Sequence, residues 1–72
     1  METLTIYCGR HQPLKARGKN QCHMLQFAYD YRGWHSYKQN CRATLNALKA
    51  LVKRGYIEVN KHNQFRLKEN VL

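Results

Sequence analysis

The sequence predicts a small, compact α+β domain with a short N-terminal strand, two main helices and a C-terminal β-hairpin. Two patterns predict this class. Helical periodicity is strong from Arg42 to Arg54, and apolar and polar residues alternate directly after Gly55. The length of 72 residues points the same way, because it suits one domain with a single core and leaves little room for an active-site cleft. We therefore expect a single domain over residues 1–72.

The chain is strongly basic. Thirteen Lys and Arg against four Asp and Glu give a formal net charge of +9, which exceeds what solubility alone requires. The hydrophobic content of 43% is too high for a disordered basic tail. The composition therefore predicts a folded protein with a polyanionic partner.

The first half of the chain predicts a strand, a basic arm and a helix. Residues Thr3 to Tyr7 alternate between polar and apolar types, as in a short strand. Residues 8–19 hold two glycines, the single proline and four basic residues without an acid, which favours a loop or arm. Asn20 is a suitable N-cap for a helix over 20–32, with Gly33 as its stop. The apolar stripe of this helix is expected to contain Cys22, Leu25, Ala28 and Tyr29, with Phe27 on the opposite side, facing the N-terminal strand or a partner.

The second half predicts a turn, a helix and a hairpin. Residues 33–40 are polar and aromatic and indicate a compact turn or one-turn helix. The helix over 41–54 has the clearest pattern, and Gly55 stands where a C-terminal cap belongs. Two alternating segments within 56–68 are separated by a polar stretch that begins and ends with asparagine, which predicts a β-hairpin.

The helix over 41–54 has two distinct faces on a helical wheel. Its predicted buried side consists of Cys41, Thr44, Leu45, Leu48, Leu51 and Val52. A separate polar stripe consists of Arg42, Asn46, Lys49 and Lys53. Arginine donates two hydrogen bonds to guanine, asparagine pairs with adenine, and lysine reaches bases or phosphates. The stripe therefore predicts contact with a DNA groove, and an ordinary solvated helix face is the alternative.

Residues 42–59 combine a leucine pattern, a basic residue, a glycine and a hydrophobic pair. Their sequence is Arg-Ala-Thr-Leu-Asn-Ala-Leu-Lys-Ala-Leu-Val-Lys-Arg-Gly-Tyr-Ile-Glu-Val. It resembles the recognition helix and first wing strand of winged helix-turn-helix transcription regulators. The resemblance implies a winged-helix fold and sequence-selective binding of duplex DNA in transcription regulation. Residues 33–37 and 63–67 are also similar to small phage or prophage proteins. The chain departs from the family pattern where the second helix is compressed into residues 33–40.

The groups expected to contact DNA lie in the turn, the helix and the hairpin. The turn supplies hydrogen-bond donors for phosphates, and the resemblance implies that the hairpin tip acts as a wing, although an ordinary polar turn is the alternative. The arm, with Arg10, Lys15, Arg17 and Lys19, is expected to add affinity rather than specificity. The predicted DNA contacts are His35, Ser36, Lys38, Gln39, Asn40, Arg42, Asn46, Lys49, Lys53, Lys61, His62 and Arg66.

Other classes of protein fit the residues less well. The carboxylates of Glu2, Asp30, Glu58 and Glu69 are scattered, so we expect neither an enzyme nor a cofactor. The residues Cys8, His11, Cys22 and His23 lack the spacing of a zinc site, so we expect no metal. Three cysteines at unrelated spacings predict reduced thiols that pack as small hydrophobes in a cytoplasmic protein. No segment has the length and apolarity of a membrane span.

Two other partners and a dimer remain as alternatives. A small phage-type inhibitor that docks on an acidic, nucleic-acid-binding protein would use the same positive charge. A protein that binds single-stranded nucleic acid would use Trp34 as a stacking platform. The limited burial available to so short a domain also leaves a homodimer open.

Overall fold

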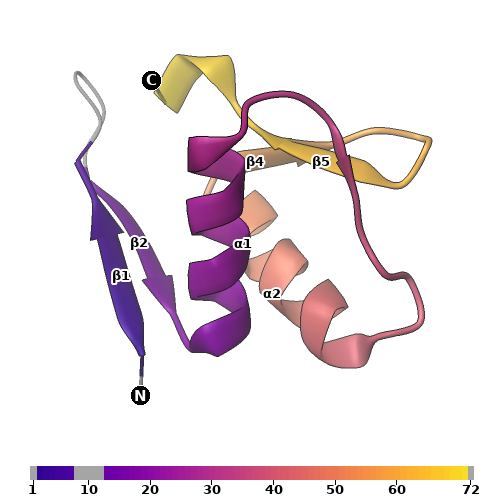
Figure 1. The fold of residues 1–72 in the computed structure, drawn as a ribbon, viewed down its shortest axis with the longest axis horizontal. Coiled ribbons are helices and arrows are strands. Elements are labelled where there is room, and N and C mark those ends of the chain that lie inside the picture. The colour runs from indigo at the N-terminus through magenta and orange to yellow at the C-terminus, as the bar shows by residue number, and fades with distance from the viewer. Residues whose placement is uncertain (1, 8–12, 72) are drawn as a thin grey trace.

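The computed structural model describes residues 2–7 and 13–71 (Figure 1). Within them, β1 and β2 form one antiparallel sheet, and three strands form a second in the order β3-β5-β4. Figure 1 shows the N-terminal hairpin on one side of α1 and helix α2 on the other. The predicted α+β class is confirmed. The elements are β1 (Thr3–Ile6), β2 (Leu14–Arg17), α1 (Lys19–Asp30), β3 (His35–Ser36), α2 (Arg42–Lys53), β4 (Ile57–Val59), β5 (Gln64–Leu67) and the 3-10 helix η1 (Glu69–Val71).

The N-terminal hairpin corrects the prediction of an irregular arm over residues 8–19. Strand β2 pairs with β1 in a register that places Leu4 opposite Ala16 and Ile6 opposite Leu14. These four apolar side chains turn toward α1 and the core. The sequence of β2 alternates apolar and basic residues, which suits a strand with one buried face, but its basic character and the nearby proline and glycines favoured a loop. Residues 8–12 of the predicted arm, with Cys8, Arg10 and His11, lie outside the described residues.

Helix α1 begins one residue earlier and ends two residues earlier than predicted. Gly18, not Asn20, occupies the N-cap position, with a φ of 85° that favours glycine, and its N–H donates to the carbonyl oxygen of Glu2 (2.7 Å). The chain therefore turns directly from the β1–β2 ladder into the helix. The predicted apolar stripe is confirmed, because Cys22, Leu25 and Ala28 are buried and Tyr29 packs against them.

Helix α2 ends in a Schellman motif at the predicted glycine. The N–H of Gly55 donates to the carbonyl of Val52 (2.9 Å), and the N–H of Tyr56 donates to that of Leu51 (3.2 Å). Gly55 has a φ of 82°, which an L side chain rarely adopts. This cap fixes the direction in which the chain enters β4.

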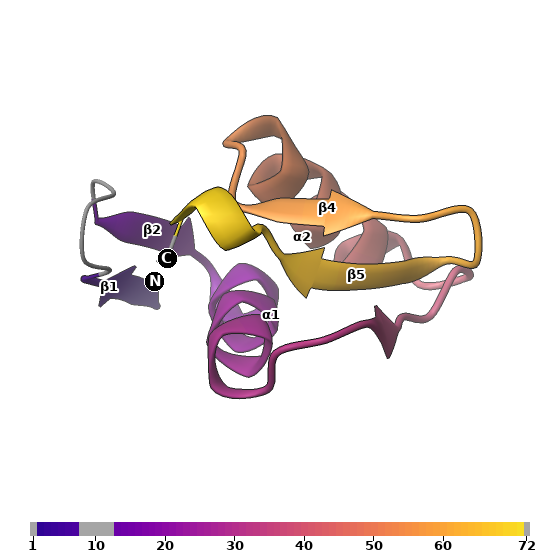
Figure 2. The ribbon, with the colours of Figure 1, turned by 90° about the horizontal axis from the view of Figure 1, so that it is seen from above.

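Strand β3 corrects the prediction of a compact turn or one-turn helix over 33–40. His35 pairs with Phe65 and Ser36 with Gln64, so the segment between the two helices is tied to the second strand of the C-terminal hairpin. The hairpin itself agrees with the prediction, with Ile57 opposite Leu67 and Val59 opposite Phe65. Figure 2, viewed from above, shows β4 and β5 lying over α2.

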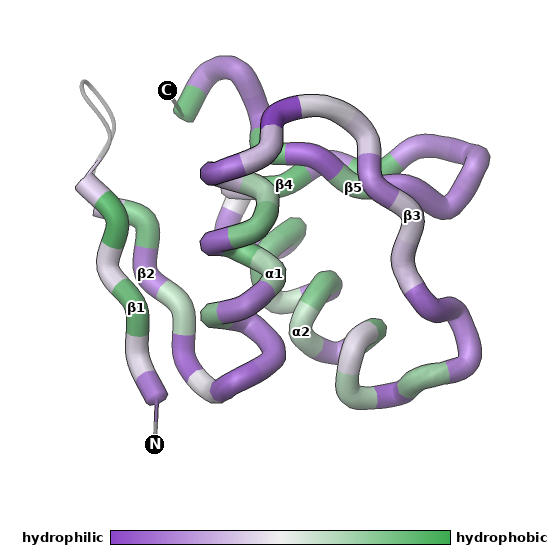
Figure 3. The backbone as a smooth tube through the Cα atoms, viewed as in Figure 1, coloured by the Kyte–Doolittle hydropathy of each residue, from purple (hydrophilic) through white to green (hydrophobic). Residues whose placement is uncertain are grey.

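The core lies where the two helices, the N-terminal hairpin and the sheet meet. Its fully buried side chains include Leu14, Leu25, Leu51 and Ile57, which come from four different elements. Figure 3 shows hydrophilic residues along the turn after β3 and along the hairpin tip. Within the described residues, neither 12-residue helix is long and apolar enough to cross a bilayer.

Candidate nucleic-acid interface

The polar stripe on α2 is fully presented to solvent. Arg42, Asn46, Lys49 and Lys53 are all exposed, whereas Ala47, Leu48 and Leu51 on the same helix are buried. The helical wheel therefore separated the polar stripe from the core correctly. It was wrong about Val52, which is 37% exposed. Ala47, which lay outside the predicted buried side, is buried instead, so the side of α2 that packs on the core is rotated from Val52 toward Ala47.

Helix α2 contains no acidic residue, so it adds no negative charge to the surface around the stripe. The four acidic residues of the chain lie directly before β1, at the end of α1, in strand β4 and in η1. Across residues 2–7 and 13–71 the one ion pair joins Arg66 and Glu58. The three cations of the stripe are consequently not neutralised by carboxylates in the described part of the chain, and their field extends into solvent.

The residues of the predicted turn divide into two groups. Lys38, Gln39 and Asn40 are exposed directly before the first turn of α2, and Ser36 and Lys38 line a shallow hollow with Thr44. His35 instead belongs to an aromatic cluster. Its Nε2–H donates to the carbonyl oxygen of Tyr31 (2.7 Å), and its ring lies 4.6 Å from that of Phe27 and 5.9 Å from that of Phe65, centroid to centroid. These contacts engage His35 in the fold, and they give Phe27 a neighbour in β3, whereas the sequence suggested the N-terminal strand or a partner.

Cys41 has an environment that the sequence analysis did not predict. The prediction treated all three cysteines as small hydrophobes, which holds for the buried Cys22, while Cys41 is half-buried at the N-cap of α2. Hydrogen bonds from the side chain and backbone of Thr44 lower the pKa of the Cys41 thiol, and the backbone of Ala43 and the charge of Lys38 act in the same direction. A cysteine directly before a predicted helix that begins with arginine is the signal that would have found it.

Asparagine side chains build the hairpin tip. The Oδ1 of Asn60 accepts hydrogen bonds from the backbone N–H groups of His62 (2.9 Å) and Gln64 (3.2 Å). Asn63 adopts the left-handed conformation with a φ of 58°, as its type allowed. Lys61 and His62 are exposed at the tip.

The side chain of Arg66 lies apart from the exposed tip residues and has partners within the fold. Its neighbours Phe65 and Leu67 are buried, so alternation along β5 turns Arg66 to the opposite face of the sheet. There its Nε–H donates to Glu58 Oε1 (2.6 Å), and its guanidinium lies 4.4 Å from the ring centroid of Trp34. Trp34, which the sequence singled out for base stacking, is thus in contact with a cation of its own chain while it remains 37% exposed.

An apolar groove separates the stripe from the hairpin. It has a volume of about 280 Å³ and runs between α2 and β4. Val52 and Val59 are 37% and 44% exposed, respectively, along its sides. The groove is lined by Tyr37, Leu45, Leu48, Lys49, Val52 and Val59.

Comparison with protein-family models, curated proteins and solved structures finds no match for this chain.

Proposed function

We propose that the chain is a winged helix-turn-helix protein that binds duplex DNA through α2, as a transcription regulator and not as an enzyme. The exposed stripe of α2 carries this proposal. It presents three cations and an asparagine on a helix that is rigidly backed by Leu48 and Leu51. Side chains on a rigid helix contribute to binding with little loss of backbone freedom.

The arrangement of elements around α2 also supports a winged helix. The strand before α2 pairs with the second strand of the hairpin that follows it, so the hairpin and the turn are held in a fixed relation to the helix. The exposed tip residues Lys61 and His62 then act as the wing and contact phosphates. Lys38, Gln39 and Asn40 approach the backbone next to the N-terminal half of α2.

The types of side chain in the stripe suit the major groove. Arg42 can donate two hydrogen bonds to a guanine, and Asn46 can pair with an adenine one turn further along the helix. Ala43 is exposed beside them, and its small side chain allows the helix to approach the base edges closely. Lys49 and Lys53 lie further along the helix, where they reach phosphates.

A selection from a random duplex library at near-physiological salt tests the proposal, followed by affinity measurements on the selected site. We expect Arg42→Ala and Asn46→Ala to lower discrimination at one base pair each by about 1–3 kcal/mol. Lys61→Ala should weaken binding to all sequences alike. Binding to the selected duplex that is no tighter than binding to heparin would show that the proposal is wrong. An enriched palindrome would indicate a dimer, because half-site symmetry mirrors protein symmetry.

The apolar groove between α2 and β4 favours a second candidate function, an inhibitor that docks on an acidic, nucleic-acid-binding protein. Exposed valines next to Lys49 suit an apolar side chain from a partner with acidic neighbours. Val59→Ser distinguishes the two functions. It should leave the affinity for duplex DNA unchanged if α2 reads a groove, and should weaken a protein complex that buries the valine.

A further inference from the structure

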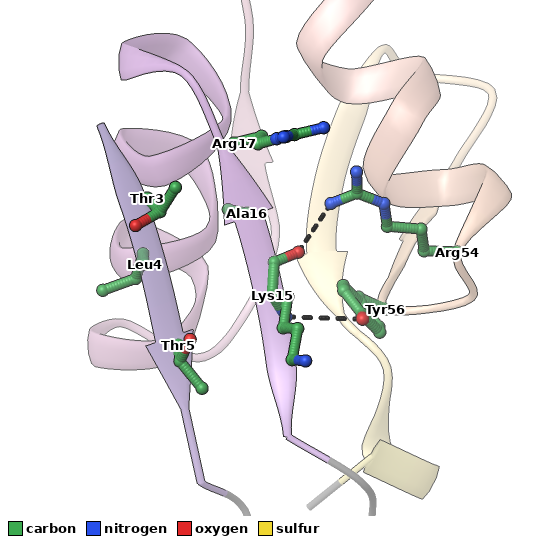
Figure 4. Close-up of a pocket in the computed structure, with 8 residues that line it drawn as sticks. All are labelled: Thr3, Leu4, Thr5, Lys15, Ala16, Arg17, Arg54 and Tyr56. Carbon is green, nitrogen blue, oxygen red and sulfur yellow. Dashed lines mark hydrogen bonds between the residues drawn. The ribbon is translucent and has the colours of Figure 1, made fainter. Parts of the chain in front are cut away.

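Positive charge is concentrated where the N-terminal hairpin meets the C-terminal end of α2. A pocket of about 450 Å³ opens at this corner (Figure 4). Three of its lining residues are cations and none is a carboxylate, and in the part of the chain that the structure describes none of the three forms an ion pair. We call Lys15, Arg17 and Arg54 the basic corner. The pocket is lined by Thr3, Leu4, Thr5, Lys15, Ala16, Arg17, Arg54 and Tyr56.

The pairing of β1 with β2 directs polar groups into this pocket. Leu4 and Ala16 face the core side of the hairpin, so alternation turns Thr3, Thr5, Lys15 and Arg17 to its outer face. The register places Thr3 opposite Arg17 and Thr5 opposite Lys15. Each cation therefore has a threonine hydroxyl as its cross-strand neighbour, and hydroxyl groups are hydrogen-bond donors to phosphate.

Arg54 enters the same pocket from α2 and is held in place by the hairpin. Its Nη1 donates to the carbonyl oxygen of Lys15 (2.6 Å) and to Gln21 Oε1 (3.3 Å). The backbone N–H of Lys15 in turn donates to the hydroxyl of Tyr56 (3.3 Å). Figure 4 shows the guanidinium groups of Arg17 and Arg54 extending toward one another from the two sides of the pocket. Two guanidinium groups that converge without a carboxylate favour an anion between them.

The basic corner is continuous with the stripe on α2. A second hollow, of about 240 Å³, shares Arg17 with the pocket and reaches Asn46 of the stripe. Lys19 and Asn20, at the start of α1, line its floor together with Ala43 and Ala47. The polar surface thus runs from Asn46 across the start of α1 to the outer face of β2, on the side of α2 away from the apolar groove.

The dimensions of α2 place the corner near a DNA backbone. From Arg42 to Arg54 the chain rises about 18 Å, at about 1.5 Å per residue. The major groove is about 12 Å wide. A helix whose N-terminal half lies in the groove therefore brings its C-terminal end to the phosphates that border it.

We propose that the basic corner binds a backbone phosphate of duplex DNA that flanks the base pairs contacted by α2. This proposal rests on the proposed function. Phosphate is the chemical group that fits, because the corner offers guanidinium, ammonium and hydroxyl donors. The contact adds affinity and orients α2, and it reads no bases.

The test compares Lys15→Gln and Arg17→Gln with the control Arg32→Gln. All three substitutions remove one charge from an exposed side chain, but Arg32 lies beyond the C-terminal end of α1, where it donates to the carbonyl of Tyr29. Arg54 is left unchanged because its hydrogen bonds hold the hairpin. Fluorescence anisotropy with a duplex of about 20 base pairs gives the affinity of each protein over a series of potassium chloride concentrations, and circular dichroism checks that each protein is folded.

We expect each test variant to reduce the slope of log affinity against log salt relative to the control, by up to about 0.9, the value for complete loss of one phosphate contact. At 0.1 M salt a complete loss corresponds to an affinity about eightfold lower, which is the upper limit for each variant, since the effect of counterion release vanishes near 1 M. The preference among base-pair variants should not change. Removing the flanking phosphates by shortening the duplex should abolish the difference between Arg17→Gln and the wild type.

Two failures are distinguishable. In the first, the wild-type protein binds the duplex, but both test variants match Arg32→Gln in slope and affinity. The basic corner then does not bind a backbone phosphate, and only this proposal is overturned. If the wild-type protein does not bind duplex DNA even at low salt, the proposed function and this proposal are both overturned.

Discussion

Cys41 illustrates how position at a helix end changes the chemistry of one residue. Cys41 is the N-cap residue of α2, and Thr44 of the first turn and the charge of Lys38 both lower the pKa of its thiol. Each of these groups stabilises a thiolate more than a thiol, and together they outweigh the desolvation that opposes ionisation. The adjacent Arg42 belongs to the proposed reading face, so a modification of Cys41 would sit directly at that face.

We expect Cys41 to react with iodoacetamide faster than the buried Cys22 at neutral pH. A lowered pKa raises the fraction of thiolate at pH 7, so the reaction rate should reach its plateau at a lower pH than for an ordinary cysteine. Thr44→Val removes the largest cause of the shift, which raises the pKa and lowers the rate at pH 7. Peptide mapping after short pulses from about pH 6 to about pH 10 follows each cysteine separately. Identical profiles for Cys41 in the wild type and in Thr44→Val would contradict this expectation.

At the scale of elements, the end of α2 determines how the hairpin follows the helix. Gly55 closes the Schellman motif in a left-handed conformation, with open space where a Cβ would lie. The cost of substitution there is therefore conformational and not steric. The same turn places Arg54 and Tyr56 beside β2.

We predict that Gly55→Ala lowers the free energy of unfolding by about 1–2 kcal/mol, because alanine is strained at positive φ. Gly55→Asn should cost less, since asparagine visits the left-handed region more readily. Lys53→Ala, an exposed substitution two residues earlier, serves as the control and should change stability by no more than about 0.5 kcal/mol. Urea unfolding measures all three variants. A loss for Gly55→Ala no larger than that for Lys53→Ala would show that the cap contributes nothing.

Local patterns predicted the elements that depend on nearby residues. The extent of α2, its cap at Gly55 and its exposed stripe follow from periodicity and residue type, and the structure agrees on the cap, on the stripe and, to within one residue at each end, on the extent. Strand β2 was missed because its basic residues and the nearby proline and glycines favoured a loop, and β3 was missed because its partner supplies the information. The two-residue β3 is defined only by pairing with β5, nearly thirty positions later, and pairing at such separation leaves no local signal.

The same division applies to the candidate site: the parts that lie on one element were predictable, and the parts that depend on tertiary contacts were not. The stripe could be predicted because one helix carries all of it, whereas the contacts of His35 with Phe27 and of Arg66 with Glu58 and Trp34 depend on tertiary structure. A wheel gives the angle of Val52 but not which neighbour covers that side of the helix. The basic corner joins two segments that are almost forty residues apart, so only the structure brings Lys15 and Arg54 together.

At the scale of the whole molecule, the net charge of +9 acts on folding as well as on binding. The molecule measures 34 × 29 × 20 Å. The Debye length is about 30 Å at 0.01 M salt and about 8 Å at 0.15 M. At low salt each cation is therefore repelled by cations across the whole fold, and at physiological salt mainly by its neighbours. This repulsion destabilises the compact state.

Salt should accordingly have opposite effects on the free protein and on its complex with DNA. We predict that raising potassium chloride from about 0.01 M to about 0.15 M increases the Tm of the free protein by a few degrees, since about 1 kcal/mol corresponds to about 4–8 °C at this chain length. The additional rise in Tm caused by excess duplex should shrink over the same range, because released counterions oppose binding. Thermal melts followed by circular dichroism, with sorbitol as a nonionic control, separate the two effects. A free protein whose Tm falls with salt would show that its positive charges are neutralised within the fold and are not presented to an anionic partner.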